Sequence, residues 1–335
     1  MINKELERFV TGKCPFRVTE GQREAIAVLA DFLLSGDKDG ACLVRGYAGT
    51  GKTAVLAALV RALGGLGRKV VLMAPTGRAA KVFAHHAGHP AFTIHKRIYR
   101  QKAFSNDTGN FQLDANLMRH TLFIVDEASM IASEGGGFGT GRLLDDLVRF
   151  VYSGEGCRLL LVGDAAQLPP VGEELSPALS RAELEGYGLH VWEAELTQVV
   201  RQEEDSGILW NATRLRRWVT SDGGGSLPGV RFSGFADIRR LPGGELVEAL
   251  EEAYSRCGAD QTLVVTRSNK RAIIYNNGIR GRIFGREEEL TGGDRVMVAR
   301  NNYFWAGEGE DRPFGFLANG DMAEVCRVRR GRGLY

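Results

Sequence analysis

The chain has 335 residues, enough for about two domains, and carries 43 Lys and Arg against 41 Asp and Glu. This balance excludes a polycation, so any nucleic-acid surface must be a local groove. The five cysteines are scattered without a C-x-x-C pair, which is typical of a reduced cytoplasmic protein. No apolar run is long enough to span a membrane, and the amino terminus is too polar for a signal peptide. We therefore expect a soluble cytoplasmic protein with no membrane partner.

The first predicted helix covers residues 23–34 and begins at a capping box. In this box Thr19 is the N-cap residue, and Gln22 follows three residues later. Each of the two side chains then accepts a hydrogen bond from the backbone N–H of the other residue. Capping is therefore one sufficient reason for a glutamine at this position.

Residues 46–53, with the sequence GYAGTGKT, match the phosphate-binding pattern G-x-x-x-x-G-K-[ST] at every fixed position. The glycines let the backbone aim successive N–H groups at phosphate oxygens. Lys52 can bridge the β- and γ-phosphates, and the Thr53 hydroxyl can ligate Mg²⁺. The apolar run 41–44 predicts a buried strand before the loop, and residues 54–63 predict a helix whose N-terminus faces the phosphates. The glycines of this loop are Gly46, Gly49 and Gly51.

Further apolar runs recur between helical stretches. Their continuous apolarity is typical of parallel strands that are buried on both faces. We therefore predict an α/β fold, a parallel sheet with helices on both faces. The first three runs and residues 41–44 are expected to form one domain that ends near residue 190, and the last run opens a second α/β unit. The runs are residues 69–73, 122–125, 158–162 and 263–266.

Two polar segments directly follow predicted strands. Asp126 and Glu127 come after the run 122–125, at the sheet edge where α/β proteins bind ligands. Phosphoryl transfer to water needs a carboxylate for Mg²⁺ and a second group that orients or deprotonates the water, so we assign the first role to Asp126 and the second to Glu127. A solvated acidic pair is the alternative. Gln167 can report the γ-phosphate, or it can be a turn residue beside Pro169-Pro170.

Six ordered segments of the chain together resemble the motif series of superfamily 1 DNA helicases of the RecD/Dda-like branch. The resemblance extends from Thr19 to Asp321 and implies a P-loop NTPase fold with two RecA-like domains. ATP would lie between these domains, single-stranded DNA would cross both, and translocation would run 5′ to 3′. The segments are residues 46–53 (GYAGTGKT), 74–81 (APTGRAAK), 93–96 (TIHK), 125–130 (VDEASM), 163–172 (GDAAQLPPVG) and 199–202 (VVRQ).

The resemblance assigns roles around ATP and Mg²⁺, the two implied cofactors. Arg201 matches an arginine that reaches the γ-phosphate from the second domain, and its alternative is a surface salt bridge. Gln22 matches the position that reads adenine, beside its capping role. Five residues match positions of the family's ATP site, namely Lys52, Thr53, Asp126, Glu127 and Gln167.

The resemblance also places single-stranded DNA beside residues 75–78 and 93–95. A backbone turn and short hydroxyls can hold phosphates without reading bases. Arg78 lies on a predicted helix and can instead belong to its solvated face. The insertion at about residues 97–121 resembles a small accessory domain (1B-like), where Phe104 or Phe111 would be the duplex-splitting wedge or would pin a small hairpin. The candidate DNA contacts are Pro75, Thr76, Arg78 and His95.

Residues 294–299 and 322–328 look like short strands flanking a turn at 319–321, and they resemble the start of an SH3-like insertion. The last two helicase motifs, of the T-x-H-K-x-Q-G and T-R-A types, do not occur in the chain. We therefore expect a truncated form: domain 1A over residues 1–190, an incomplete second RecA-like domain 2A over 191–288, and the start of the SH3-like 2B insertion over 289–335.

The expected function is an ATP-dependent DNA helicase or translocase, with poor turnover and little unwinding because of the truncation. The alternative is a non-motor module that binds ATP and DNA. A phosphotransferase fits poorly, since Glu127 and the Gln167 segment suit attack by water. The expected partners are single-stranded DNA and proteins of DNA repair or recombination, and we expect a monomer.

Overall fold

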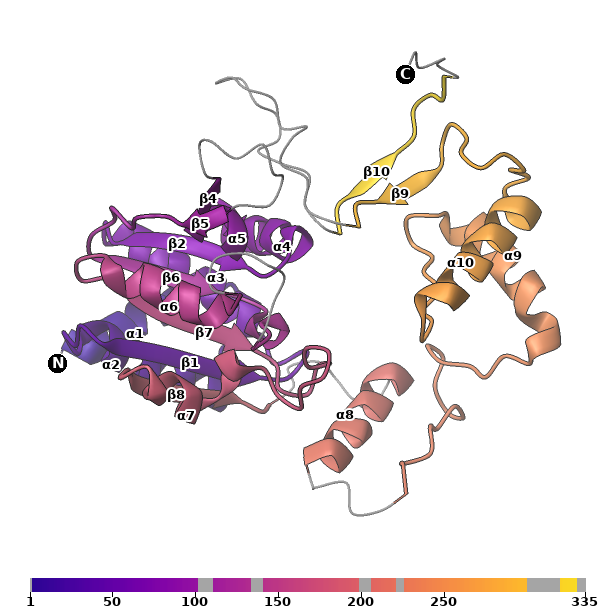
Figure 1. Ribbon diagram of the computed structural model, residues 1–335. Coiled ribbons are helices and arrows are strands. Elements are labelled where there is room, and N and C mark those ends of the chain that lie inside the picture. Colours follow the sequence, from indigo (N-terminus) through magenta and orange to yellow (C-terminus); the bar gives the residue numbers. More distant parts are fainter. Residues whose placement is uncertain are drawn as a thin grey trace, which may run out of the picture. The chain divides into compact units, whose positions relative to one another are not determined.

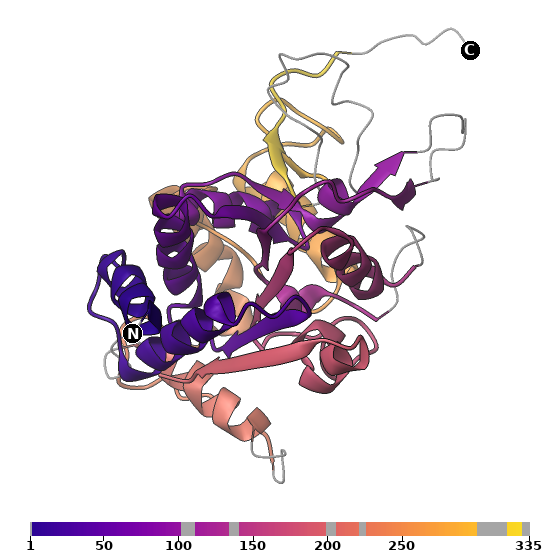
Figure 2. The same cartoon turned by 90° about the vertical axis from the view of Figure 1, so that its left-hand side faces the viewer.

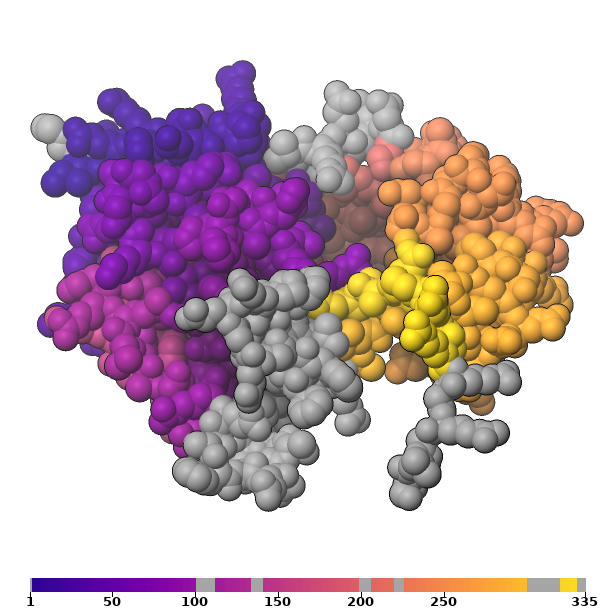
Figure 3. Space-filling view, turned by 90° about the horizontal axis from the view of Figure 1, so that it is seen from above, coloured from indigo at the N-terminus to yellow at the C-terminus, as the bar shows by residue number. Residues whose placement is uncertain are grey.

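The computed structural model describes two compact units (Figure 1). Figure 3 shows them in space-filling form, the first mainly in indigo to magenta and the second mainly in orange to yellow. The described residues are 2–101, 111–133, 141–198, 206–220, 226–299 and 320–329. The first unit comprises Met1–Gln202, Val219–Asp222 and Ala299–Asp321, and the second comprises Glu203–Trp218, Gly223–Val298 and Met322–Tyr335.

A six-stranded sheet forms the centre of the first unit, and each pair of neighbouring strands is parallel. Its strand order is β3-β2-β6-β7-β1-β8, so β7 lies between β6 and β1 although all three are far apart in the sequence. The predicted parallel α/β sheet is therefore confirmed. The strands are β1 (Gly40–Gly46), β2 (Lys69–Ala74), β3 (Ala91–Thr93), β6 (Thr121–Val125), β7 (Arg158–Gly163) and β8 (His190–Leu196).

Helices cover both faces of this sheet (Figures 1 and 2). Successive strand residues point to opposite faces, so Cys42 and Val44 pack into one core while Ala41 and Leu43 pack into the other. Each buried Leu or Val side chain in these cores contributes roughly 1.5–3 kcal/mol. The first core lies under α1 (Ile2–Gly12), α2 (Glu20–Leu34), α3 (Lys52–Gly65) and α4 (Gly77–Ala87). The second lies under α5 (Ile94–Ile98), α6 (Leu143–Ser153) and α7 (Arg181–Gly186).

The first unit includes β8, which begins at the predicted domain boundary near residue 190. The reason is the pairing of β8 with β1, in which Val44 lies opposite Ala194. In the predicted insertion, β4 (Tyr99–Gln101) and β5 (Phe111–Leu113) form an antiparallel pair. Two short 3-10 turns, η1 (Ala128–Met130) and η2 (Pro177–Leu179), follow β6 and β7.

The second unit is built from helices and one antiparallel pair of short strands. The pair confirms the strands predicted after residue 290, since Ala323 lies opposite Val296. The strand predicted at residues 263–266 is wrong. No described strand pairs with this segment, so Leu263 and Val265 are each 85% exposed. The elements are α8 (Gly207–Thr220), η3 (Gly243–Glu245), α9 (Leu246–Cys257), α10 (Asn269–Gly278), η4 (Ile279–Ile283), β9 (Arg295–Met297) and β10 (Met322–Glu324).

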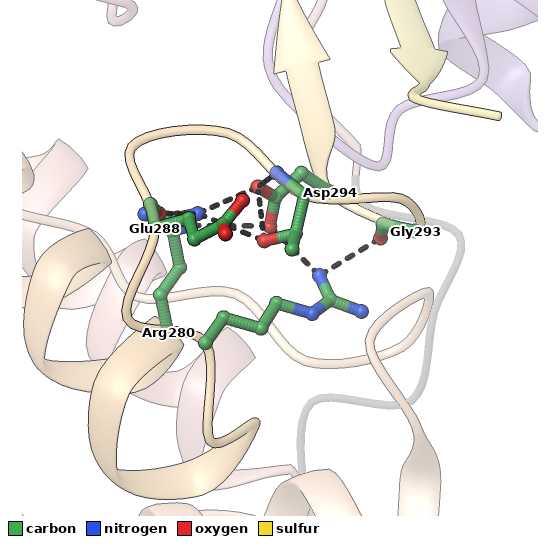
Figure 4. A network of polar contacts seen from close by, with 6 residues as sticks. Arg280, Glu288, Gly293 and Asp294 are labelled. Atoms are coloured by element: carbon green, nitrogen blue, oxygen red, sulfur yellow. Dashed lines mark hydrogen bonds and ion pairs between the residues drawn. The ribbon is translucent and has the colours of Figure 1, made fainter. Parts of the chain in front are cut away.

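Asp294, which precedes β9, links Arg280 at the start of η4 to Arg286 in the following loop (Figure 4). Arg280 donates to its carboxylate at 2.7 and 3.1 Å, and Arg286 donates to it at 2.8 Å. The side-chain hydrogen bond from Arg280, followed by the backbone hydrogen bond from Thr291, holds the pKa of Asp294 well below its usual range. Two guanidinium groups thus fix one buried carboxylate. Over the described residues, no helix combines the length and the apolarity that crossing a membrane requires.

Candidate nucleotide site

The predicted catalytic segments of the first unit meet at the carboxyl edge of its sheet. The phosphate-loop motif follows β1, Asp126 follows β6, and Asp164 follows β7. These three strands are neighbours, so their following loops lie side by side. In a parallel sheet this edge is the usual place for a ligand.

The loop between β1 and α3 depends on its glycines. Gly49 and Gly51 have φ angles of +82° and +85°, which only glycine adopts without strain. A Cβ atom at Gly46 would lie 2.7 Å from Leu196 Cβ and 3.1 Å from Lys52 Cγ, so this glycine allows the loop to pass close to β8. The loop is closed by Thr50, whose hydroxyl donates to the Tyr47 carbonyl at 2.7 Å.

Lys52 lies in the loop with its ammonium group held by oxygen atoms. Its Nζ donates to the carbonyls of Gly46 at 2.6 Å and Tyr47 at 3.0 Å, and it lies 3.6 Å from Asp164 Oδ2. We did not predict Asp164 as a site residue. The sequence signal was available, because Asp164 directly follows a buried strand, as Asp126 does.

Asp126 and Thr53 bring two oxygen groups together next to Lys52. Asp126 is only 6% exposed, and its burial raises the pKa of its carboxyl, while hydrogen bonds from the Glu127 backbone and the Thr53 side chain oppose this rise. A carboxylate and a hydroxyl are ligands that Mg²⁺ accepts. The donor set therefore fits the magnesium ion that the sequence implies.

Glu127 has a left-handed backbone conformation and a carboxyl pKa above its ordinary value. Its φ of +56° is in the left-handed region, which is uncommon outside glycine and often occurs at functional sites. Burial raises the pKa of Glu127, and the nearby charge of Asp126 raises it further. A hydrogen bond from the Gln167 side chain opposes the increase and brings the two predicted residues together.

A cavity of about 480 Å³ joins these groups. Its lining includes Glu127, Gln167, Lys52, Thr53, Gly49 and Gly51. A volume of this size is within the range of small-molecule sites, roughly 300–1,000 Å³. A larger cavity of about 650 Å³ lies at the opposite, amino-terminal edge of the sheet, between α1, Leu122 and Arg158. It is mainly apolar and does not include the phosphate loop, so it is not the nucleotide site.

Gln22 forms the predicted capping box and also contacts the phosphate loop. Its Oε1 accepts from Thr19 N at 3.0 Å, while Thr19 Oγ1 accepts from Gln22 N at 3.3 Å. Its Nε2 donates to the Thr50 carbonyl at 2.9 Å, and the residue is 1% exposed. Gln22 therefore links the start of α2 to the loop, and contact with adenine stays a prediction.

The candidate DNA contacts lie just after the neighbouring strands β2 and β3. Pro75 and Thr76 follow β2, and Thr76 Oγ1 accepts from Ala79 N at 3.2 Å as the N-cap of α4. Arg78 is exposed on α4. His95 lies on α5, where burial lowers its pKa and its ring packs 5.7 Å from that of Tyr99. These four residues occupy the same sheet edge as the phosphate loop, and their contact with DNA stays a prediction.

Three predicted residues cannot be evaluated from the described side chains. Arg201 and Phe104 lie outside the described residues. The backbone of Phe111 lies in β5, but its side chain is not described. The γ-phosphate arginine and the wedge therefore stay predictions.

The parallel sheet, with the phosphate-loop motif between β1 and α3, defines the fold of a P-loop domain. The chain belongs to the AAA domain family, whose model matches residues 17–219. The predicted relation to RecD- and Dda-like helicases is confirmed as a distant homology over most of the chain.

Three curated relatives illustrate this homology. The chain is 29% identical over 273 residues to the ATP-dependent RecD2 DNA helicase of Deinococcus radiodurans, covering 78% of this chain and 34% of that protein. It is 26% identical over 296 residues to the ATP-dependent DNA helicase dda of Enterobacteria phage T4, covering 84% and 61%. It is 33% identical over 278 residues to the conjugal transfer protein TraA of Rhizobium radiobacter, covering 80% and 21%. The chain thus corresponds to part of each relative.

Solved structures of Pif1 helicases are also similar. Unliganded Pif1 from Bacteroides sp. has a TM-score of 0.45 and 18% identity, with 94% of this chain and 70% of that chain covered. Pif1 from Candida albicans has a TM-score of 0.44 and 17% identity, with 85% and 57% covered.

Proposed function

We propose that the chain hydrolyses ATP with Mg²⁺ and couples this reaction to 5′ to 3′ movement on single-stranded DNA, as part of a DNA helicase. The observation that carries the proposal is the meeting of Lys52, Glu127 and Gln167 on one cavity, beside Asp126 and Thr53. RecD2 and Dda, with which the chain shares distant homology, are ATP-dependent DNA helicases by name. Domains 1A, 2A and 2B belong to this proposal with the boundaries that the sequence suggests.

The residues divide the chemistry of hydrolysis among them. Lys52 exchanges the carbonyls of Gly46 and Tyr47 for the β- and γ-phosphates. Asp126 and Thr53 would hold Mg²⁺, which would supply positive charge next to the phosphates. Glu127 accepts the proton of the attacking water, and its raised pKa makes it a stronger base than an exposed carboxylate. Gln167 donates to Glu127 and orients the same water.

ATP hydrolysis by wild type, Lys52→Ala and Glu127→Gln, with and without single-stranded DNA, tests this assignment. We expect DNA to stimulate the wild type and each substitution to lower kcat by about 100-fold or more, since each removes a group that acts in the transition state. Glu127→Gln should still bind nucleotide, because the phosphate loop is intact. Lys38→Ala and Glu185→Gln, which change exposed residues outside the cavity, should keep the wild-type rate. Equal rates in wild type and Lys52→Ala would contradict the proposal.

Polarity and motor activity need a separate measurement. Strand displacement from duplexes with either a 5′ or a 3′ single-stranded tail should be weak and should proceed from the 5′ tail. Binding of ATP and DNA without DNA-stimulated hydrolysis would instead favour the non-motor module. Transfer of phosphate to an acceptor other than water would favour a phosphotransferase.

A further inference from the structure

A buried serine joins the two segments that carry Glu127 and Gln167. We define the Glu127 loop as residues 126–133 and the Gln167 loop as residues 164–176. Ser176, at the end of the second loop, lies 2.9 Å from the Ala128 carbonyl and 2.6 Å from the Ile131 carbonyl through its Oγ. Ser176 is 1% exposed, and both partners are fully buried. The contact is therefore shielded from water, which strengthens a hydrogen bond.

A second contact joins the same two loops. Glu173 Oε1 accepts from Ser133 N at 2.6 Å, near the end of the Glu127 loop. At the other end, a Cβ atom on Gly163 would lie 3.0 Å from Ser129 N, so β7 passes directly against this loop. The Gln167 loop thus holds the Glu127 loop through two contacts, one from Ser176 and one from Glu173. The Ser176 contact is the more buried of the two.

The backbone of Glu127 explains why such a contact matters. Its left-handed conformation is unfavourable for a non-glycine residue and persists only where neighbouring structure holds it. The next three residues form η1, in which Ile131 N donates to the Ala128 carbonyl at 3.1 Å. Ser176 shares its single hydroxyl proton between this carbonyl and that of Ile131, so its Oγ lies against both ends of this turn.

We propose that Ser176 is a positioning residue for ATP hydrolysis. Its hydroxyl holds the turn after Glu127, so that the Glu127 carboxyl keeps its place beside Gln167 and its half-buried surroundings. This inference rests on the proposed role of Glu127. Ser176 does not line the nucleotide cavity, so its effect on catalysis is indirect.

The test is a comparison of Ser176→Ala with Ser180→Ala in the full chain. Ser180 lies four residues further on and caps α7, where its Oγ accepts from Glu183 N at 3.3 Å. Both variants lose one serine hydroxyl and its local hydrogen bonds, but only Ser176 contacts the Glu127 loop. We expect Ser176→Ala to lower kcat by about 10- to 100-fold, as a small misplacement of a catalytic group does. The KM for ATP should stay within about twofold, because the phosphate loop is unchanged.

Nucleotide binding provides a readout that separates positioning from a loss of folded protein. Ser176→Ala should bind ATP with the stoichiometry and affinity of the wild type, because the phosphate loop is unchanged, while its kcat falls. A loss of ATP binding that parallels the loss of kcat, or an equal loss of kcat in Ser176→Ala and Ser180→Ala, would overturn the inference.

If Ser176→Ala does not fold, Glu173→Ala carries the test with Glu174→Ala as its control. Glu174 is an exposed neighbour. A loss of kcat in Glu173→Ala alone supports coupling of the loops, and equal rates in the two variants refute it. A wild-type rate no higher than that of Lys52→Ala would refute the proposed function itself. A clear wild-type rate with no effect of Ser176→Ala refutes only the role of Ser176.

Discussion

The negative charge of Asp164 acts on both Lys52 and Glu127. Its carboxylate is almost fully buried, lies 3.6 Å from Lys52 Nζ, and accepts from Ala166 N at 2.9 Å. Its negative charge is one of the causes that raise the pKa of Glu127. The acidity of the proposed base thus depends on a residue that contacts the proposed phosphate-binding lysine.

We predict that Asp164→Asn moves the acid limb of the kcat profile to lower pH. Removing a negative charge makes the ionised form of Glu127 less costly, so its pKa falls. Catalysis by an ionised Glu127 is lost as the pH drops through that pKa, and the loss should therefore begin at a lower pH in the variant. ATPase rates measured between about pH 5 and 8, where such a limb lies for a raised carboxyl pKa, test this shift.

The control for this substitution is Asp114→Asn, which removes a solvent-exposed carboxylate paired with Arg100. Its profile should match that of the wild type. A limb that stays in place in Asp164→Asn, or moves to higher pH, would show that Asp164 does not act on Glu127.

Among the elements, α2 agrees most fully with its sequence signal. The capping box at Thr19 and Gln22 is present, and the helix ends at Leu34 as predicted. Because Gln22 also donates to the Thr50 carbonyl, the start of this helix supports the phosphate loop. A local capping pattern thus contributes to the site.

We predict that Thr19→Ala lowers the free energy of unfolding by about 1 kcal/mol, the usual cost of losing an N-cap hydroxyl. Thr19→Ser should restore most of this loss, since serine provides the same acceptor. Chemical denaturation of the three proteins measures the difference. Equal stability of Thr19→Ala and the wild type would mean that the box adds nothing to the fold.

Some of the apolar runs in the sequence predicted strands correctly and one did not. The runs 69–73, 122–125 and 158–162 became β2, β6 and β7, whereas residues 263–266 did not form a strand. A run of apolar residues is compatible with a strand, but a strand also needs a hydrogen-bonded neighbour. The first three runs have such neighbours within the sheet, and the last has none among the described strands.

On the scale of the whole molecule, the two units have different sources of stability. The first has extensive apolar cores on both faces of its sheet. In the second, Ile279 is the one described apolar side chain that is buried, and Asp294 forms a buried ionic network with Arg280 and Arg286. We therefore expect the second unit to depend strongly on this network.

We predict that Asp294→Ala destabilises the second unit and removes part of its acid sensitivity. The pKa of Asp294 is held below the value of about 3.9 that Asp has in unfolded chains. Its ionised form therefore stabilises the fold above that value, and this contribution is lost as the pH falls through the lower native pKa. Hydrogen exchange, measured separately for each unit during thermal unfolding, reports the stability of the second unit. Measurements at about pH 7 and about pH 3, on either side of the unfolded-state pKa of Asp, test both the loss of stability and the loss of acid sensitivity.

Asp260→Ala is the matched control, because Asp260 is an exposed carboxylate paired with Arg295 in the same unit. Exposed ion pairs contribute little, so this variant should unfold like the wild type. If Asp294→Ala also unfolds like the wild type, the network does not stabilise the unit.

The sequence by itself determined the phosphate-loop motif, the strands around it and the pair Asp126-Glu127, because each is a local pattern of neighbouring residues. Only the tertiary structure decided that β7 lies between β6 and β1, which brings Asp164 to Lys52. It also decided that Ser176 bonds to the turn after Glu127, which lies 45 to 48 positions earlier in the chain. The physical reason is that the order of parallel strands depends on long-range pairing and packing, which local spacing does not encode.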